Sequence, residues 1–254
     1  MEKKILRNIA RAAGSTAVLL AGAANAADSF NHQRMGSPEP VIDSVIYWGS
    51  DLSYGNSGRY GLGVDAGFVT ALNGDLGIEG WTLTGNLGLS RSVDLASRTN
   101  AAYGSVLLGY LWPMDGYYFS LGAGVNVINN NQTPPGGPTD GSKIGALIQY
   151  GFETTQTNAF YTQSYGSYST ANDEIYFHAK AGYKNATLRF GPEFTLSDDN
   201  GGQPTLRFGG VVGDIPLGDK VKMSISAGYQ RDLNPGVADR FYTMVGFSVP
   251  LSTR

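Results

Sequence analysis

Residues 174–184 read EIYFHAKAGYK, a stretch in which apolar and polar residues alternate. Ile175 and Phe177 occupy alternate positions, and His178 and Lys180 stand at the positions between the apolar ones. Successive side chains on a β-strand point to opposite faces, so this period of two predicts a strand. One face of that strand is apolar and the other is polar, so we expect the strand to separate two environments.

The same period of two continues along the chain from Val41 onward, with turn-forming residues between the alternating segments. It predicts about 12 strands of about 10 to 14 residues, close to the length with which a tilted strand crosses a bilayer. The predicted strands are 42–54, 59–72, 79–91, 101–112, 116–129, 142–154, 158–169, 174–184, 186–196, 203–214, 220–231 and 239–250.

The polar faces of these segments carry mainly Gly, Ser, Thr and Asn instead of the many Lys and Glu of a water-facing sheet. Only 15% of the residues are charged, against about 25% in an average soluble domain. Large aromatic residues such as Trp81, Trp112 and Tyr183 stand near strand ends, as in the aromatic belts of membrane proteins. Lipid requires every backbone group to be paired, so a spanning sheet must close. The expected fold class is therefore all-β, a single closed antiparallel transmembrane β-barrel; a secreted soluble β-sandwich is the alternative.

The connections between the predicted strands also differ in length. Segments 113–115 and 155–157 are short, whereas 130–141 and 232–238 are long. Outer-membrane barrels have short periplasmic turns and longer outer loops, and an even number of strands puts both termini in the periplasm. Within predicted strand 186–196, Pro192 cannot donate to the ladder, so we expect a bulge or kink there.

The N-terminal part of the chain has the features of an export signal. Residues 1–11 are basic, residues 12–23 are apolar, and Ala24-Asn25-Ala26 resembles a cleavage site. We therefore expect a signal peptide at 1–26, a polar segment at 27–40 and the barrel domain at 41–254. The apolar stretch is too short for a spanning helix, so the expected destination is the outer membrane of a Gram-negative cell.

Composition excludes several classes of function. The formal net charge of −3 gives no basic field for nucleic acid. The absence of cysteine excludes a thiolate metal site, a catalytic cysteine and a lipoprotein anchor. No spacing of His and carboxylates suggests a metal site, and the acidic run 198–200 is expected to be a solvated loop. We expect neither a metal nor a cofactor, and outer-membrane lipid is the expected surrounding.

The polar faces place several charged residues toward the predicted lumen, where charges must pair. Such residues form either a selective pore or polar ligand site, or an ion-pair network that fills a small barrel; the second is favoured. Arg207 and Glu193 lie on adjacent predicted strands, so Glu193 is the expected partner of Arg207. The lumen-facing candidates are Asp51, Asp65, His178, Lys180, Arg189, Glu193 and Arg207, with Lys220 and Lys222 on the same faces.

A hydrolytic site would need a nucleophile near His178, the one histidine of the barrel segment. Ser164 and Ser167 precede it, and Asp173 and Glu174 lie nearby. No catalytic motif supports such a site, so we expect a protein that is not an enzyme and assign no catalytic residue.

Seven short blocks, in their order and spacing, resemble the cellulose biosynthesis protein BcsS family of alphaproteobacteria. The resemblance extends from about Val45 to Val249. The blocks are 71–76 (ALNGDL), 79–81 (EGW), 109–112 (GYLW), 168–171 (YSTA), 191–193 (GPE), 206–209 (LRFG) and 227–229 (AGY).

This resemblance implies a non-enzymatic outer-membrane accessory in the biosynthesis or export of bacterial cellulose. Cellulose or components of the synthase secretion machinery are the partners that it implies. Two other functions stay open from the sequence: a small solute channel of the outer membrane and, behind it, a lipid-modifying hydrolase.

Overall fold

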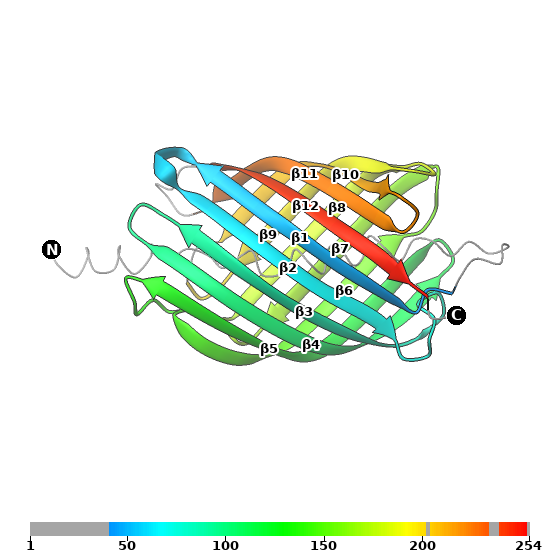
Figure 1. Ribbon diagram of the computed structural model, residues 1–254, viewed down its shortest axis with the longest axis horizontal. Helices are drawn as coiled ribbons and strands as arrows, with labels where there is room; N and C mark the ends of the chain where they lie inside the picture. The colour runs from blue at the N-terminus through cyan, green and yellow to red at the C-terminus, as the bar shows by residue number, and fades with distance from the viewer. Residues whose placement is uncertain (1–40, 202–203, 234–238, 253–254) are drawn as a thin grey trace.

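A computed structural model describes residues 41–201, 204–233 and 239–252 (Figure 1). The expected signal peptide at 1–26 and the polar segment at 27–40 lie outside the described residues. The described part of the chain contains no helix that is long and apolar enough to cross a membrane.

The described residues form twelve strands, which close into a single antiparallel barrel. A short 3-10 turn, η2 (Asn56–Gly58), joins the first two strands. The strands are β1 (Ser44–Gly55), β2 (Tyr60–Ala71), β3 (Gly80–Val93), β4 (Arg98–Met114), β5 (Tyr117–Thr133), β6 (Gly141–Thr154), β7 (Ala159–Ser169), β8 (Glu174–Lys184), β9 (Arg189–Asp198), β10 (Thr205–Leu217), β11 (Val221–Asp232) and β12 (Arg240–Leu251).

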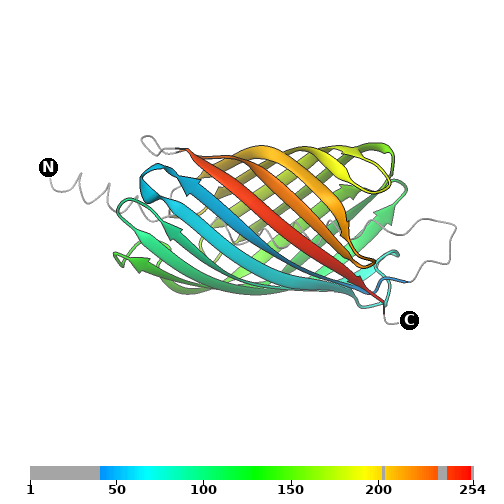
Figure 2. The same cartoon turned by 45° about the horizontal axis from the view of Figure 1, so that its top comes forward.

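The barrel closes where the first strand pairs with the last. β1 and β12 run antiparallel, from the pair Ser44 and Leu251 to the pair Gly55 and Arg240. Each other strand pairs with its neighbours in the sequence, and the strands are steeply inclined to the long axis of the barrel (Figures 1 and 2). The predicted closed barrel of about 12 antiparallel strands is confirmed. The observed strands match the predicted segments closely, and β4 and β5 extend furthest beyond their predicted ends.

The alternation in the sequence becomes an inward face and an outward face. Along β1 the side chain of Tyr47 is fully buried, whereas Trp48 and Leu52 are 39% and 47% exposed. Large apolar side chains are exposed on the other strands as well, for example Phe208 and Leu87. A closed sheet with an apolar outer wall buries that wall only in lipid, so the soluble β-sandwich is excluded.

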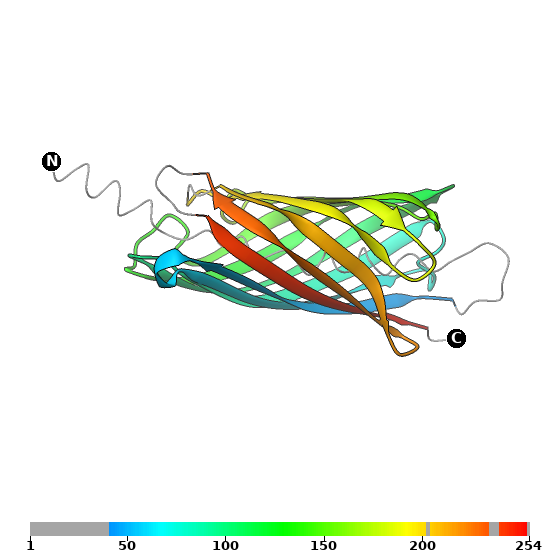
Figure 3. The same ribbon diagram turned by 90° about the horizontal axis from the view of Figure 1, so that it is seen from above.

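The barrel has two distinct ends. We call the end at which β1 begins and β12 ends the terminal end, and the opposite end the distal end (Figure 3). The connection 115–116 at the terminal end is short, whereas 134–140 and 199–204 at the distal end are long. The connection 72–79 at the terminal end is as long as the distal ones, so the periplasmic position of the terminal end stays a prediction.

The bulge or kink expected at Pro192 is not found there, because β9 keeps its register with both neighbouring strands. The β8–β9 pairing skips the two positions opposite Gly191 and Pro192 without a change of register. A register shift lies instead in β10, between Val212 and Ile215, where Asp214 adopts a positive φ of 60°. A bulge re-aims side chains, and this one buries the side chain of Asp214.

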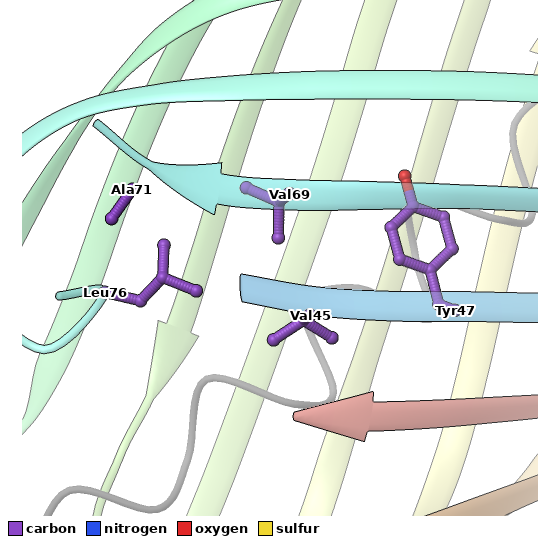
Figure 4. Close-up of a cluster of buried hydrophobic side chains, with 5 residues drawn as sticks. All are labelled: Val45, Tyr47, Val69, Ala71 and Leu76. Carbon is purple, nitrogen blue, oxygen red and sulfur yellow. The ribbon is translucent and has the colours of Figure 1, made fainter. Parts of the chain in front are cut away.

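Apolar residues as well as polar ones fill the terminal end of the interior (Figure 4). Val45 and Tyr47 of β1 and Val69 and Ala71 of β2 are buried together. Leu76 joins them from the β2–β3 connection, which is fixed to the start of the barrel by a backbone hydrogen bond from Leu76 to Ile42. The connection therefore packs against the first two strands.

Candidate functional site

The seven charged or titratable side chains expected in the lumen are all buried, none more than 7% exposed. They belong to two separate regions. Arg189 lies at the terminal end of β9, and the other six lie further along the interior on β1, β2, β8, β9 and β10. The residues are Asp51, Asp65, His178, Lys180, Arg189, Glu193 and Arg207.

Arg207 forms a bidentate ion pair with Asp51 in the middle of the interior. Its Nη1 lies 2.6 Å from Oδ2 of Asp51, and its Nη2 lies 3.1 Å from Oδ1. Its Nε donates to the side chain of Gln230 at 3.0 Å, and its guanidinium stands 5.1 Å from the ring centre of Tyr242. The expectation that Glu193 is its partner is wrong, because barrel closure brings β1 within reach of β10.

Glu193 instead joins a second group beside the first. The hydroxyl of Tyr242 donates to its Oε1 at 2.8 Å, and Nε2 of His178 lies 3.6 Å from its Oε2. Lys180 is directly opposite Glu193 in the β8–β9 register, so the two opposite charges are neighbours on the inward face. Since Tyr242 contacts both Glu193 and the guanidinium of Arg207, the two groups form one continuous polar network.

His178 is positioned by hydroxyls. Its Nδ1 lies 3.0 Å from Oγ1 of Thr195 and 3.4 Å from the hydroxyl of Tyr176. Ser164, considered above as a nucleophile, has the opposite parity on β7, and its Oγ lies 2.8 Å from the hydroxyl of Tyr150. The histidine and this serine therefore belong to opposite faces of the wall.

A second ion-pair network lies at the terminal end. Arg189 contacts Glu153 at 3.0 Å and Asp214 at 3.2 Å, and Lys222 lies 3.7 Å from Asp214. Lys220, expected to face the lumen, is instead exposed in the turn before β11. The sequence analysis did not place Asp214 in the lumen. Its inward orientation depends on the β10 bulge, and the alternation of apolar and polar residues does not show a bulge.

A third network lies at the distal end and was missed entirely. Arg59 contacts Asp94 at 2.7 Å and Asp232 at 3.2 Å, and Arg240 contacts the same two carboxylates at 3.0 and 3.4 Å. These four residues, which we call the distal latch, join the β1–β2 and β3–β4 connections to the distal ends of β11 and β12. Following the inward parity to the ends of the predicted strands identifies Arg59 and Arg240, and following it a few residues further identifies Asp94 and Asp232.

Tyrosines occupy the middle of the interior. Tyr47 on β1 donates to Oδ1 of Asn86, and Tyr165 on β7 stands edge-on to Tyr176, with ring centres 5.9 Å apart. β1 and β7 are opposite each other in the ring of strands, yet Tyr47 and Tyr165 are close enough to interact electrostatically. Tyr47 and Tyr165 belong to separate buried clusters on the inward face.

Two small pockets lie among the described residues of the interior. One lies beside Asp214 and Lys222, the other lies beside Tyr103 and Glu174, and each has a volume of about 10 Å³. That volume accommodates about one water molecule. Among the described residues there is no group of three or more His, Asp or Glu side chains arranged to hold a metal ion.

Comparison with solved structures identifies outer-membrane barrels. The beta domain of the Bordetella autotransporter BrkA is 12% identical, with a TM-score of 0.51 over 83% of this chain and 100% of that chain. The KdgM porin in complex with disordered oligogalacturonate is 9% identical, with a TM-score of 0.47 over 82% and 99% of the two chains. Outer membrane phospholipase A from Escherichia coli is 11% identical, with a TM-score of 0.47 over 89% and 97%. At these identities the likeness concerns the fold.

No functionally curated protein matches the sequence. A family model does match, over residues 45–251, which includes every strand of the barrel except the first residue of β1. Together with the closed barrel and its apolar outer wall, this match identifies an outer-membrane protein. The chain belongs to the family of the cellulose biosynthesis protein BcsS.

Proposed function

We propose that this protein is a non-enzymatic accessory of cellulose biosynthesis and export, and that it acts at the outer membrane as an anchoring or guiding element for the secretion machinery. Membership of the BcsS family supports the link to cellulose. The buried ion pairs across the interior support a role that does not involve threading the glucan through this barrel.

The buried ion pairs across the interior are the observation that carries this choice. The Arg207–Asp51 pair joins β10 to β1, and the Arg189–Glu153 pair joins β9 to β6, so each pair links strands that are not neighbours in the barrel wall. A glucan chain in transit would have to break these buried ion pairs. Leaving one partner of such a pair buried alone costs about 3 to 5 kcal/mol, so opening the lumen is strongly unfavourable.

The same observation weakens the alternative of a small solute channel. A solute passing through the middle of the interior would have to displace the buried ion pairs Arg207–Asp51 and Arg189–Glu153. The hydrolase alternative has less support, because the inward-facing His178 contacts Thr195 and Glu193 within the ion-pair network. An enzyme needs a substrate within reach of its catalytic groups, and these groups are buried.

A clean deletion of the gene tests the proposal. We expect cellulase-sensitive dye binding at the cell surface to fall, glucan synthesis by inner-membrane preparations to persist, and a restored gene to repair the surface defect. Unchanged surface cellulose in the deletion strain would refute the cellulose role.

Planar-bilayer recording of the purified protein tests the second half of the proposal separately. We expect no conductance steps from the folded barrel. Steady conductance steps, together with a cellulose defect in the deletion strain, would favour passage of the glucan over anchoring.

A further inference from the structure

The hairpin between β8 and β9 places two positive charges side by side at the terminal end of the barrel. Lys184 is the last residue of β8, Arg189 is the first residue of β9, and the two are directly opposite each other in the register. Both side chains are buried, with exposed fractions of 3% and 0%. Like charges directly opposite each other on a sheet repel, so this arrangement requires compensating negative charge.

The turn of the hairpin holds the two strand ends together. The side-chain oxygen of Asn185 accepts the backbone N–H groups of Thr187 and Leu188, at 2.8 and 2.7 Å. The backbone N–H of Asn185 donates to the carbonyl of Leu188 at 2.9 Å. Asparagine side chains stabilise tight turns in this way, so the repulsion is not relieved by separation of the strands.

The two cations differ in their partners. Arg189 contacts Glu153 at 3.0 Å and Asp214 at 3.2 Å. The ammonium of Lys184, by contrast, makes neither a hydrogen bond nor an ion pair with any part of the chain that the structure describes. An ammonium carries three hydrogen-bond donors and no acceptor, and burying it without a partner is costly.

Glu153 is one of the two carboxylates that act electrostatically on Lys184, and both of its oxygens are in use. Its Oε1 accepts from Arg189 at 3.0 Å. Its Oε2 accepts from the hydroxyl of Tyr118 at 3.0 Å and from the side-chain amide of Gln163 at 2.9 Å. The carboxylate of Glu153 is therefore held away from Lys184 by three other side chains.

Asp214 is the other carboxylate that acts on Lys184, and it already serves two cations. Its Oδ1 lies 3.2 Å from Arg189 and 3.7 Å from Lys222. Lys184, Arg189 and Lys222 carry three positive charges, whereas Glu153 and Asp214 carry two negative ones. These five side chains therefore have a net charge of +1, whichever way they pair.

We propose that the β8–β9 hairpin binds an oxyanion inside the terminal end of the barrel, with the ammonium of Lys184 as its main partner and the guanidinium of Arg189 beside it. The chemical class is a carboxylate or phosphate group, whose oxygens accept short, charge-assisted hydrogen bonds from lysine and arginine. One such group offsets the excess positive charge and satisfies the buried ammonium. The site goes beyond the role in cellulose export and does not depend on it.

Thermal unfolding of the full chain, folded in detergent micelles, tests the site. The probes are inorganic phosphate and acetate, each compared with sodium chloride at the same ionic strength. We expect at least one of them to raise the melting temperature by about 5 to 10 °C at roughly 100 times its dissociation constant. Lys184→Met should remove this shift. Lys220→Met, the same change at an exposed position of the same end, should retain it.

Two results would overturn the proposal: a wild-type barrel that responds to neither anion beyond the effect of chloride, or a Lys184→Met barrel that responds as wild type does. If Lys184→Met does not fold, amine labelling of the wild-type barrel with trinitrobenzenesulfonate provides the test. The anion should slow labelling of Lys184 and leave labelling of Lys220 unchanged. An unchanged rate at Lys184, or equal slowing at both lysines, would refute the site.

Discussion

The guanidinium of Arg207 on β10 and the carboxylate of Asp51 on β1 form a buried ion pair with an Nη1–Oδ2 distance of 2.6 Å, although 156 residues separate them in the sequence. The pair exists only because the barrel closes through β12 and β11. It lies in the same polar network as Glu193 and His178, so the middle of the interior is held from several strands at once.

Arg207→Ala should destabilise the barrel by about 3 to 5 kcal/mol, because it leaves Asp51 buried without its counter-charge. Urea unfolding in detergent micelles measures this loss. The double variant Asp51→Leu with Arg207→Met should recover most of it, since an apolar pair replaces the ion pair. A double-mutant cycle that couples Arg207 more strongly to Glu193 than to Asp51 would contradict the assignment.

Removal of both arginines of the distal latch, Arg59→Ala with Arg240→Ala, should release the connections at the distal end while the twelve-strand ladder persists. Two aspartates would then repel each other where four charges now alternate. We expect faster proteolysis within the connection 94–97 and unchanged heat-modifiable migration of the folded barrel. Arg91→Ala, an exposed arginine on β3, is the matched control. Equal cleavage rates in all variants would show that the latch does not order this end.

Gly124 and Gly104, on the neighbouring strands β5 and β4, should differ sharply in their tolerance of alanine. A Cβ at Gly124 would lie 2.0 Å from the backbone oxygen of Val106, whereas the nearest atom to a Cβ at Gly104 is 3.7 Å away. Gly124→Ala should therefore cost about 1 to 3 kcal/mol or more through overpacking, and Gly104→Ala should cost little. The folded yield on refolding and the urea midpoint measure both. Equal tolerance would mean that β4 and β5 separate more readily than their register indicates.

The connection 134–140 should respond to acid through Asp140. Backbone N–H groups of Gly136 and Gln132 donate to its carboxylate, and these bonds lower the pKa of Asp140 below its ordinary value. The carboxylate therefore stabilises the connection at neutral pH, and this contribution is lost as the pH falls through the lowered pKa. The amide shifts of Gly136 and Gln132 should move together on titration below about pH 4, the ordinary range of an aspartate. Asp140→Asn should abolish the transition; its persistence would assign it to another group.

Strand positions and faces were predictable because they depend on local geometry. Ile175, Phe177 and Tyr183 were assigned to the lipid face of β8 from their spacing, and Ile175 and Tyr183 are 48% and 45% exposed. The distal latch was not predicted: Asp94 and Asp232 lie just beyond the predicted strands, and Arg59 and Arg240 lie within the first two positions of theirs, where the inward face was not followed to the strand end.

The amino-acid sequence by itself determined the number of strands, their two faces and the family, because a period of two and the order of short blocks are properties of neighbouring residues. Only the tertiary structure decided which charges pair. Strand inclination and closure set which inward residues share a height in the barrel, so Arg207 meets Asp51 and Arg189 meets Glu153. The β10 bulge then turns Asp214 inward. Pairing across the barrel is a long-range consequence of closure, and no local pattern records it.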